Sequence, residues 1–215
     1  MTWDGIQQNI DNCASCRGNY IGVVPKRPPP PLTGVPLFLT EAPPESGGFW
    51  HDSDPPDRLR RVLFTLLRDI RLEFRTLSFG RQGRGAFQQK LFLIQTLKWP
   101  LDNSAGSLPP QIRRAIRHSV ETHLIQEISM LRPRGIFASG AAAGLACCLL
   151  APRSGLCEFF SARAFEKEVV GSRIEADFPR MGRIPVYFSH LLVDRFQSRA
   201  KEHVRKFLDE MWGTP

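Results

Sequence analysis

The sequence predicts a three-layer α/β/α domain built around a central, mostly parallel sheet of four strands. Two observations lead to this fold class. Short apolar runs recur along the 215 residues without polar alternation, which is typical of parallel strands covered on both faces. Longer segments with apolar residues at helical spacing lie between these runs, and such an alternation of strands and helices indicates a parallel sheet with helices on both sides.

The first part of the chain predicts a lead-in to this domain. Residues 1–16 predict a short helix that ends in a turn with the pattern Cys13-x-x-Cys16. The stretch VVPKRPPPPLTG follows, and it is expected to be extended because proline fits neither a helix interior nor a central strand. We therefore divide the chain into a lead-in that packs on the domain, residues 1–34, and the α/β/α domain, residues 35–215.

The elements of the domain follow in order. The predicted strands are the apolar runs at 35–39, 91–97, 135–139 and 184–189. The predicted helices lie at 56–77, 109–131, 141–150 and 193–212. The second of these begins with a proline pair suited to a first turn, and the third is apolar on all sides, which indicates a buried helix.

Composition and charge limit the class of protein. A hydrophobic fraction of 42% with 23% charged residues is ordinary for a globular protein, and the longest apolar run is too short to span a membrane. Five cysteines, two of them adjacent, and the lack of a signal-peptide pattern predict a reduced, intracellular protein, and we expect a cytoplasmic, nucleoid-associated one. The net charge of +8 indicates a polyanionic partner, most simply nucleic acid.

Polar residues follow the predicted strands at the point where each strand ends. Glu41 comes just after the first, and Gln95 lies near the end of the second. Ser139 and Gly140 come at the end of the third, where a helix opens, and His190 follows the fourth. Ligands of open parallel sheets bind at the carboxyl ends of the strands. We therefore expect Glu41 and His190 to face each other across one cleft.

Four stretches in order along the chain resemble the uracil-DNA glycosylase superfamily, most closely its family 4 branch. They are LFLTEAPPESGGFW, FLIQTLKWPLDNSAGSLPP, LIQEISMLRPRGIFASGAAAGL and IPVYFSHLL. The resemblance runs from Cys13 to the last helix. It implies an α/β/α fold, a DNA partner, a monomer, and an enzyme that flips uracil or another modified pyrimidine out of DNA and excises it.

The departures from that family change what is expected at the site. The glycines that flank the first motif's acid are Thr40 and Pro44 here, and the asparagine of the second strand is Gln95. The family's iron–sulfur cluster needs four cysteines. Cys13 and Cys16 match the first pair, but Trp99 and Val120 stand at the other two positions. The sequence therefore predicts no cluster, no other metal and no cofactor.

The resemblance assigns a role to each candidate residue. Glu41 would orient or deprotonate water and stabilise positive charge on the sugar, and His190 would stabilise negative charge on the departing base. Phe49, with Trp50 as the close alternative, would stack on the flipped base, and the amide of Gln95 would read its edge.

Candidate DNA contacts come from basic and apolar residues near these motifs. Arg81 and Arg84 lie in the glycine-rich stretch FGRQGRG, and Arg195 follows the His190 motif. Leu191 or Leu192 would wedge into the base stack, as apolar side chains do in proteins that kink DNA.

Two further classes of function remain open at this point. A protein of the same fold could recognise DNA or a damaged base without cutting, because Gln95 has a longer side chain than the family's asparagine. A small-nucleotide hydrolase is a third class, although the positive charge and the lack of a clear phosphate loop count against it.

Overall fold

The computed structural model describes residues 2–17, 32–43, 58–71, 74–75, 90–99, 108–152, 159, 161–179, 181–192 and 197–213. Within these ranges the chain forms a five-stranded sheet with the order β2-β1-β3-β5-β4. The strands are β1 (Leu37–Thr40), β2 (Phe92–Gln95), β3 (Ile136–Ser139), β4 (Arg173–Phe178) and β5 (Gly182–Ser189). The predicted α/β/α class is confirmed.

One strand was not predicted. β1, β2, β3 and β5 pair in parallel, but β4 pairs antiparallel with β5 and forms the edge of the sheet. In β4 the apolar residues Ile174, Ala176 and Phe178 alternate with charged, exposed residues, so this edge strand has no continuous apolar run. The expectation of four strands is wrong for that reason.

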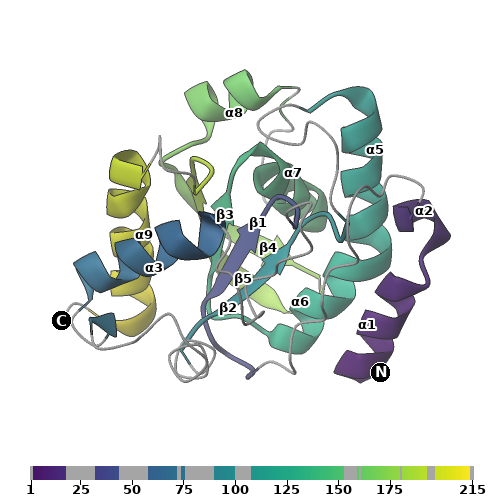
Figure 1. Ribbon diagram of the computed structural model, residues 1–215, viewed down its shortest axis with the longest axis horizontal. Helices are drawn as coiled ribbons and strands as arrows, with labels where there is room; N and C mark the ends of the chain where they lie inside the picture. Colours follow the sequence, from purple (N-terminus) through teal and green to yellow (C-terminus); the bar gives the residue numbers. More distant parts are fainter. Residues whose placement is uncertain are drawn as a thin grey trace.

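The helices cover both faces of the sheet (Figure 1). The helical elements are α1 (Trp3–Asp11), α2 (Ala14–Arg17), α3 (Arg58–Ile70), α5 (Pro110–Ser119), α6 (Ile125–Leu131), α7 (Ala141–Leu150), α8 (Ala162–Glu168) and α9 (Gln197–Trp212). A π-helical turn, η2 (Val120–Leu124), joins α5 to α6, so the predicted helix at 109–131 is continuous but contains one wide turn.

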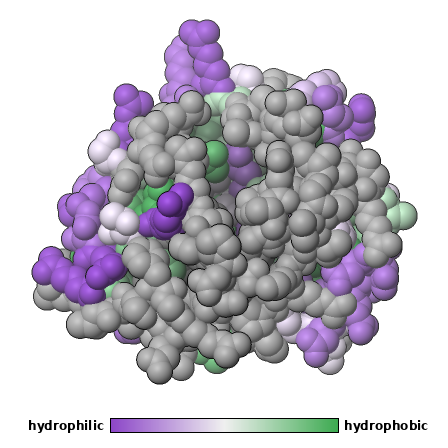
Figure 2. Space-filling view, in the orientation of Figure 1, coloured by the Kyte–Doolittle hydropathy of each residue, from purple (hydrophilic) through white to green (hydrophobic). Residues whose placement is uncertain are grey.

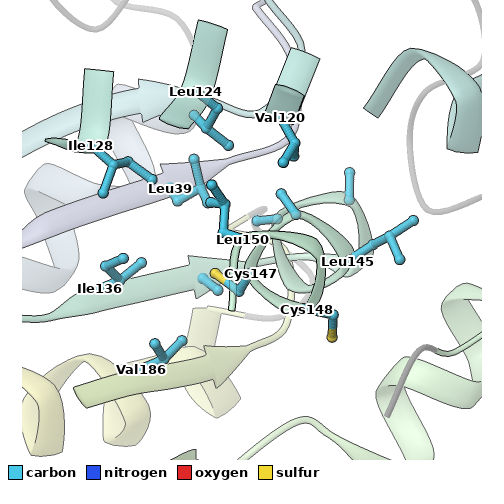
Figure 3. Close-up of a cluster of buried hydrophobic side chains, with 14 of the residues drawn as sticks. Leu39, Val120, Leu124, Ile128, Ile136, Leu145, Cys147, Cys148, Leu150 and Val186 are labelled. Carbon is cyan, nitrogen blue, oxygen red and sulfur yellow. The ribbon is translucent and has the colours of Figure 1, made fainter. Parts of the chain in front are cut away.

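The two faces of the sheet bury separate apolar cores. Leu39 and Ile136 point to a core shared with α5, η2, α6 and α7, and Figure 3 shows Val120, Leu124 and Ile128 pointing toward it. Phe38 and Phe137, at alternate positions, point to the core shared with α3 and α9. α7 is buried along almost its whole length, as its apolar sequence predicts.

The N-terminal helix lies outside the α5–α6 layer (Figure 1). Trp3, Ile6 and Ile10 of α1 are buried, and the side-chain amide of Gln7 donates to Glu127 of α6 at 3.3 Å. On the face seen in Figure 2, hydrophilic side chains gather at the two sides of the molecule. None of the described helices is long and apolar enough to cross a membrane.

Candidate active site at the carboxyl edge of the sheet

Glu41 and His190 lie at the same edge of the sheet. Glu41 directly follows β1 and His190 directly follows β5, and both of these strands pair in parallel with β3. Two strand spacings of about 4.8 Å place the two backbones roughly 10 Å apart. The N-terminus of α7 begins between them, because Gly140 links β3 to that helix and its N–H donates to the Ser189 carbonyl at 3.0 Å.

The side chain of Glu41 lies against Gly140 at the N-terminus of α7. A methyl group added at Gly140 would meet Glu41 Oε1 at 2.8 Å and Glu41 Cδ at 3.1 Å, and the φ of Gly140 is +88°. Glycine is thus required twice, by the backbone conformation and by the closeness of the carboxylate. Glu41 as a residue is only 7% exposed, and the helix N-terminus favours a negative charge on its side chain.

The backbone that follows Glu41 is fixed by the neighbouring strand. The N–H of Leu97 donates to the Glu41 carbonyl at 2.8 Å, and the N–H of Thr96 donates to the Thr40 carbonyl at 2.8 Å. The ladder between β1 and β2 therefore continues past the strand ends. This continuation holds Glu41 on a rigid backbone.

His190 is held by contacts to its backbone and its ring. The hydroxyl of Ser139 donates to the His190 carbonyl at 3.2 Å and accepts from the N–H of Leu192 at 3.0 Å. The His190 ring stacks on His203 of α9, with centroids 6.3 Å apart. Burial lowers the pKa of His190, the positive charge of Arg199 adds to this effect, and Glu166 opposes it. The imidazole is therefore neutral at neutral pH.

A row of buried polar side chains crosses the ends of the four parallel strands. Thr40 is in register with Gln95, and Ser139 is in register with Ser189. All four are 0–2% exposed. The Ser189 hydroxyl contacts Nδ1 of His203 at 3.1 Å, whereas Thr40 Oγ1 and Gln95 Oε1 have no hydrogen-bond partner among the residues that the structure describes. Buried polar atoms without partners are rare; Gln95 Oε1 can accept a hydrogen bond from a ligand, and the Thr40 hydroxyl can accept or donate one.

The sequence places Gln95 and Ser139 at these strand ends, but the hydroxyls of Thr40 and Ser189 were not predicted as part of the row. The signal was present, because each of the four strands ends in a polar residue after an apolar run. Strand alternation places the row on the side of the α3–α9 core, whereas Glu41 lies on the side of α7. A ligand at this edge can therefore be contacted from both sides of the sheet.

Other predicted site residues are placed differently. Leu192 is fully buried in the core with α9, which corrects the expectation that it could insert into DNA. Leu191 is half-buried. Phe49, Trp50, Arg81, Arg84 and Arg195 lie outside the residues that the structure describes.

A second group of reactive side chains lies between the α1–α2 segment and the α5–η2 helix, beside Lys98 and Trp99, which follow β2. Cys13, Cys16, His118 and His123 each offer one ligand atom, and these atoms all lie within 4.8 Å of one another. Burial, followed by the neighbouring Cys13, raises the pKa of the Cys16 thiol to about 12, while the Lys98 charge and the Trp99 indole act in the opposite direction. Burial lowers the pKa of His123 to about 4, helped by the charges of Lys98 and His118.

The expectation of no metal considered only the cysteines of the chain, and it missed the two histidines. A cavity of about 300 Å³ opens beside this group and is lined by Cys16, His118, Lys98, Trp99 and Arg114 among others. Trp99 is thus close to Cys16, at the position where the family resemblance would place a third cysteine. Cys147 lies in α7 and is fully buried in the apolar core (Figure 3), so it cannot join the group.

Neither a scan against protein-family models nor a search of curated proteins finds a match to this chain.

Proposed function

We propose that the protein is a DNA glycosylase that flips a uracil or another modified pyrimidine into the carboxyl edge of the sheet and hydrolyses its N-glycosidic bond. The observation that carries this proposal is the placement of one buried carboxylate, Glu41, and one neutral histidine, His190, on either side of the N-terminus of α7. The motif resemblance to the uracil-DNA glycosylase superfamily supports the same activity. We also propose that it acts as a monomer and in the cytoplasm.

Glu41 suits the side of the reaction on which positive charge develops. Cleavage of a glycosidic bond gives the sugar oxocarbenium character, and a fixed carboxylate stabilises that charge while it orients or deprotonates the attacking water. The hydrogen bond from Leu97 to the Glu41 carbonyl and the close contact with Gly140 limit the movement of this carboxylate. Its charge is therefore organised before substrate binds.

His190 suits the side on which negative charge develops. The departing pyrimidine becomes an anion delocalised over ring nitrogen and its carbonyl oxygens, and a donor aimed at that charge lowers the barrier. A neutral imidazole can donate one N–H while it remains a poor general acid at neutral pH. The stack on His203 and the backbone contacts of Ser139 fix the orientation of the ring.

The unpartnered atoms of Thr40 and Gln95 support recognition of a base edge at the same place. A pyrimidine presents a donor beside an acceptor, and an amide with a nearby hydroxyl offers the complementary pair. Buried polar groups that remain unpaired without the correct ligand give strong discrimination. The net charge of +8 supports a nucleic-acid partner, since phosphate contacts supply much of the affinity for DNA.

The test is single-turnover cleavage of a panel of labelled oligonucleotides, each with one modified pyrimidine in single- or double-stranded DNA. We expect at least one base to be released, leaving an abasic site, and His190→Ala to slow that release by about 10²–10³-fold, as for loss of one oxyanion donor. Failure to release any base from the panel would contradict the proposal.

A second function is favoured by one specific observation, the contact of the Glu41 carboxylate with the N-terminus of α7. A carboxylate there can serve as a helix cap, and the edge would then hold a flipped base without cutting. Tight binding of one modified oligonucleotide with no release of its base would identify this function.

A further inference from the structure

The four side chains Cys13, Cys16, His118 and His123 have the geometry of a metal site that is separate from the proposed active site. Cys13 Sγ lies 3.1 Å from His118 Nε2, and Cys16 Sγ lies 3.4 Å from His123 Nε2. All four ligand atoms lie within 4.8 Å of one another, so a single ion between them could contact all four.

The cysteine half of the group is built by the turn between α1 and α2. The N–H of Cys13 donates to the Ile10 carbonyl at 3.1 Å at the end of α1, and α2 starts at the next residue. The N–H of Cys16 points back to Cys13 Sγ at 3.4 Å. This N–H···S contact orients the Cys13 sulfur.

The histidine half depends on the π-helical turn η2. Residues five apart in a regular α-helix differ by about 140° around the axis, so His118 and His123 would point in different directions. The wide turn Val120–Leu124 contains His123 and begins two residues after His118, and a π-turn brings residues five apart to nearly the same face. The two rings meet edge to face with centroids 5.9 Å apart.

We propose that this group binds one Zn²⁺ ion through two thiolates and two imidazoles. The spacings Cys-x₂-Cys and His-x₄-His both fall within those of structural zinc sites. Bond lengths of about 2.3 Å to sulfur and 2.0–2.1 Å to nitrogen put S and N roughly 3.5 Å apart in a tetrahedron, close to the two S···N distances here. A set of two sulfurs and two nitrogens selects zinc among the common ions.

The arrangement of the two sulfur and two nitrogen ligand atoms disfavours an iron–sulfur cluster in this group. In a two-iron cluster with two cysteines and two histidines, the cysteines bind one iron and the histidines bind the other. Here each sulfur instead lies beside a nitrogen, and all four atoms surround one point. Val120, at the position of a fourth cluster cysteine in the resembling family, points into the apolar core (Figure 3).

The ion has a structural role, because four protein ligands fill a tetrahedral shell and leave no position for substrate. It joins the α1–α2 segment to the α5–η2 helix, two parts of the chain about a hundred residues apart. Lys98 and Glu127 form a buried ion pair beside the group, and Glu127 also accepts from Gln7 of α1. The metal site and this polar pair together attach the N-terminal segment to the domain.

Metal analysis of the purified wild-type protein tests the proposal, independently of any enzymatic activity. We expect one zinc per chain. Replacement by Co²⁺ should give the intense visible bands of a tetrahedral site together with thiolate-to-cobalt charge transfer. Iron with acid-labile sulfide, or a Cys13–Cys16 disulfide without metal, would overturn the proposal, as would protein that binds neither ion.

Variants identify the ligands. Cys13→Ser and His118→Gln alter the half-buried pair of ligands, and each should weaken zinc binding at least tenfold, since even outer contacts of a metal site are worth about 10–100-fold. Cys148→Ala is the matched control, because Cys148 is buried in α7 outside the group, and it should keep one zinc. Undiminished zinc affinity in both ligand variants would show that the ion binds elsewhere.

Discussion

The carboxyl edge of the sheet and the cysteine–histidine group use two different ways of bringing distant residues together. At the edge, Glu41 and His190 each follow a parallel strand, so both lie at the carboxyl end of the sheet as a consequence of the strand order. In the group, Cys13 and Cys16 meet His118 and His123 only because a short turn and a π-helical turn orient all four side chains. The first arrangement follows from topology, and the second needs local backbone geometry that topology does not determine.

The chemistry of the two regions differs in the same way. Within the described part of the chain, the edge keeps two buried polar atoms without a hydrogen-bond partner, Thr40 Oγ1 and Gln95 Oε1. Such atoms are typical of a site that completes its hydrogen bonds with a ligand. The cysteine–histidine group has a full set of four ligands for one ion. We therefore expect the edge to act on a substrate and the group to stabilise the fold, and the following predictions are designed to separate these roles.

Removal of zinc should have the largest effect, and only on one region. Zinc at about 100–1,000 times its Kd stabilises the bound state by roughly 2.7–4.1 kcal/mol. After chelation, the amides of α1 and α2 should therefore exchange about 10²–10³-fold faster in hydrogen–deuterium exchange. The amides of β1 and β3 are the internal control and should change little. Equal acceleration across the sheet would mean that the group supports the whole fold rather than its N-terminal segment.

Gln95→Leu should separate activity from stability. The variant removes a buried amide oxygen that accepts from none of the described residues, so the free energy of unfolding should stay the same or rise. Base excision should fall by about 10²–10³-fold if the amide contacts the base. Urea unfolding and single-turnover cleavage measure the two effects.

Gln7→Leu is the matched control, because Gln7 is equally buried but donates to Glu127. It should lose stability by about 1 kcal/mol and keep full activity. Loss of stability without loss of activity in Gln95→Leu would show that Gln95 only packs in the sheet.

Gly140→Ala should affect both stability and activity. The φ of +88° costs a residue with a Cβ about 1–3 kcal/mol, and the new methyl group would displace the Glu41 carboxylate. Gly182→Ala provides the comparison, since Gly182 has a φ of +79° but nothing within 4 Å of an added Cβ. Thermal unfolding should show a loss in both variants, and cleavage should slow only in Gly140→Ala. Similar cleavage rates in the two variants would show that the contact between Gly140 and the Glu41 side chain is not needed for cleavage.

The pH dependence of stability should show the smallest effect. Burial lowers the pKa of His190 and of His203, and His190 lowers that of His203 further. The unfolded chain therefore takes up protons first as the pH falls below about 6.5, so the stability that is complete above that pH is lost during acidification, by at most about 1.4 kcal/mol per pH unit for each histidine.

His203→Gln removes one of these two groups. The loss of stability below pH 6.5 should be shallower in this variant than in the wild type when both are unfolded in urea across the pH range. If the stability of the variant falls with pH as steeply as that of the wild type, the stacked rings of His190 and His203 do not cause the loss of stability below pH 6.5.

The contrast between the regions also explains what the sequence could predict. Runs such as those before Glu41 and His190 reveal buried parallel strands, and the strand-end rule then places both residues at one edge. β4 was missed because an edge strand needs no continuous apolar run. Leu192 was misassigned because an apolar residue after a strand can pack either inward or outward, and here α9 covers it. His118 and His123 were missed because regular helical spacing separates them, and only the π-turn brings them together.

The most direct test of the proposed function is single-turnover cleavage of the best substrate by the wild type and by Glu41→Gln, with DNA affinity measured in parallel. The substitution keeps the shape and hydrogen-bonding reach of the side chain but removes its charge. We predict a cleavage rate lower by about 10²–10⁴-fold with nearly unchanged affinity, which is the usual contribution of a positioned acid or base. Equal rates would show that Glu41 only caps α7 and would contradict its role in bond cleavage.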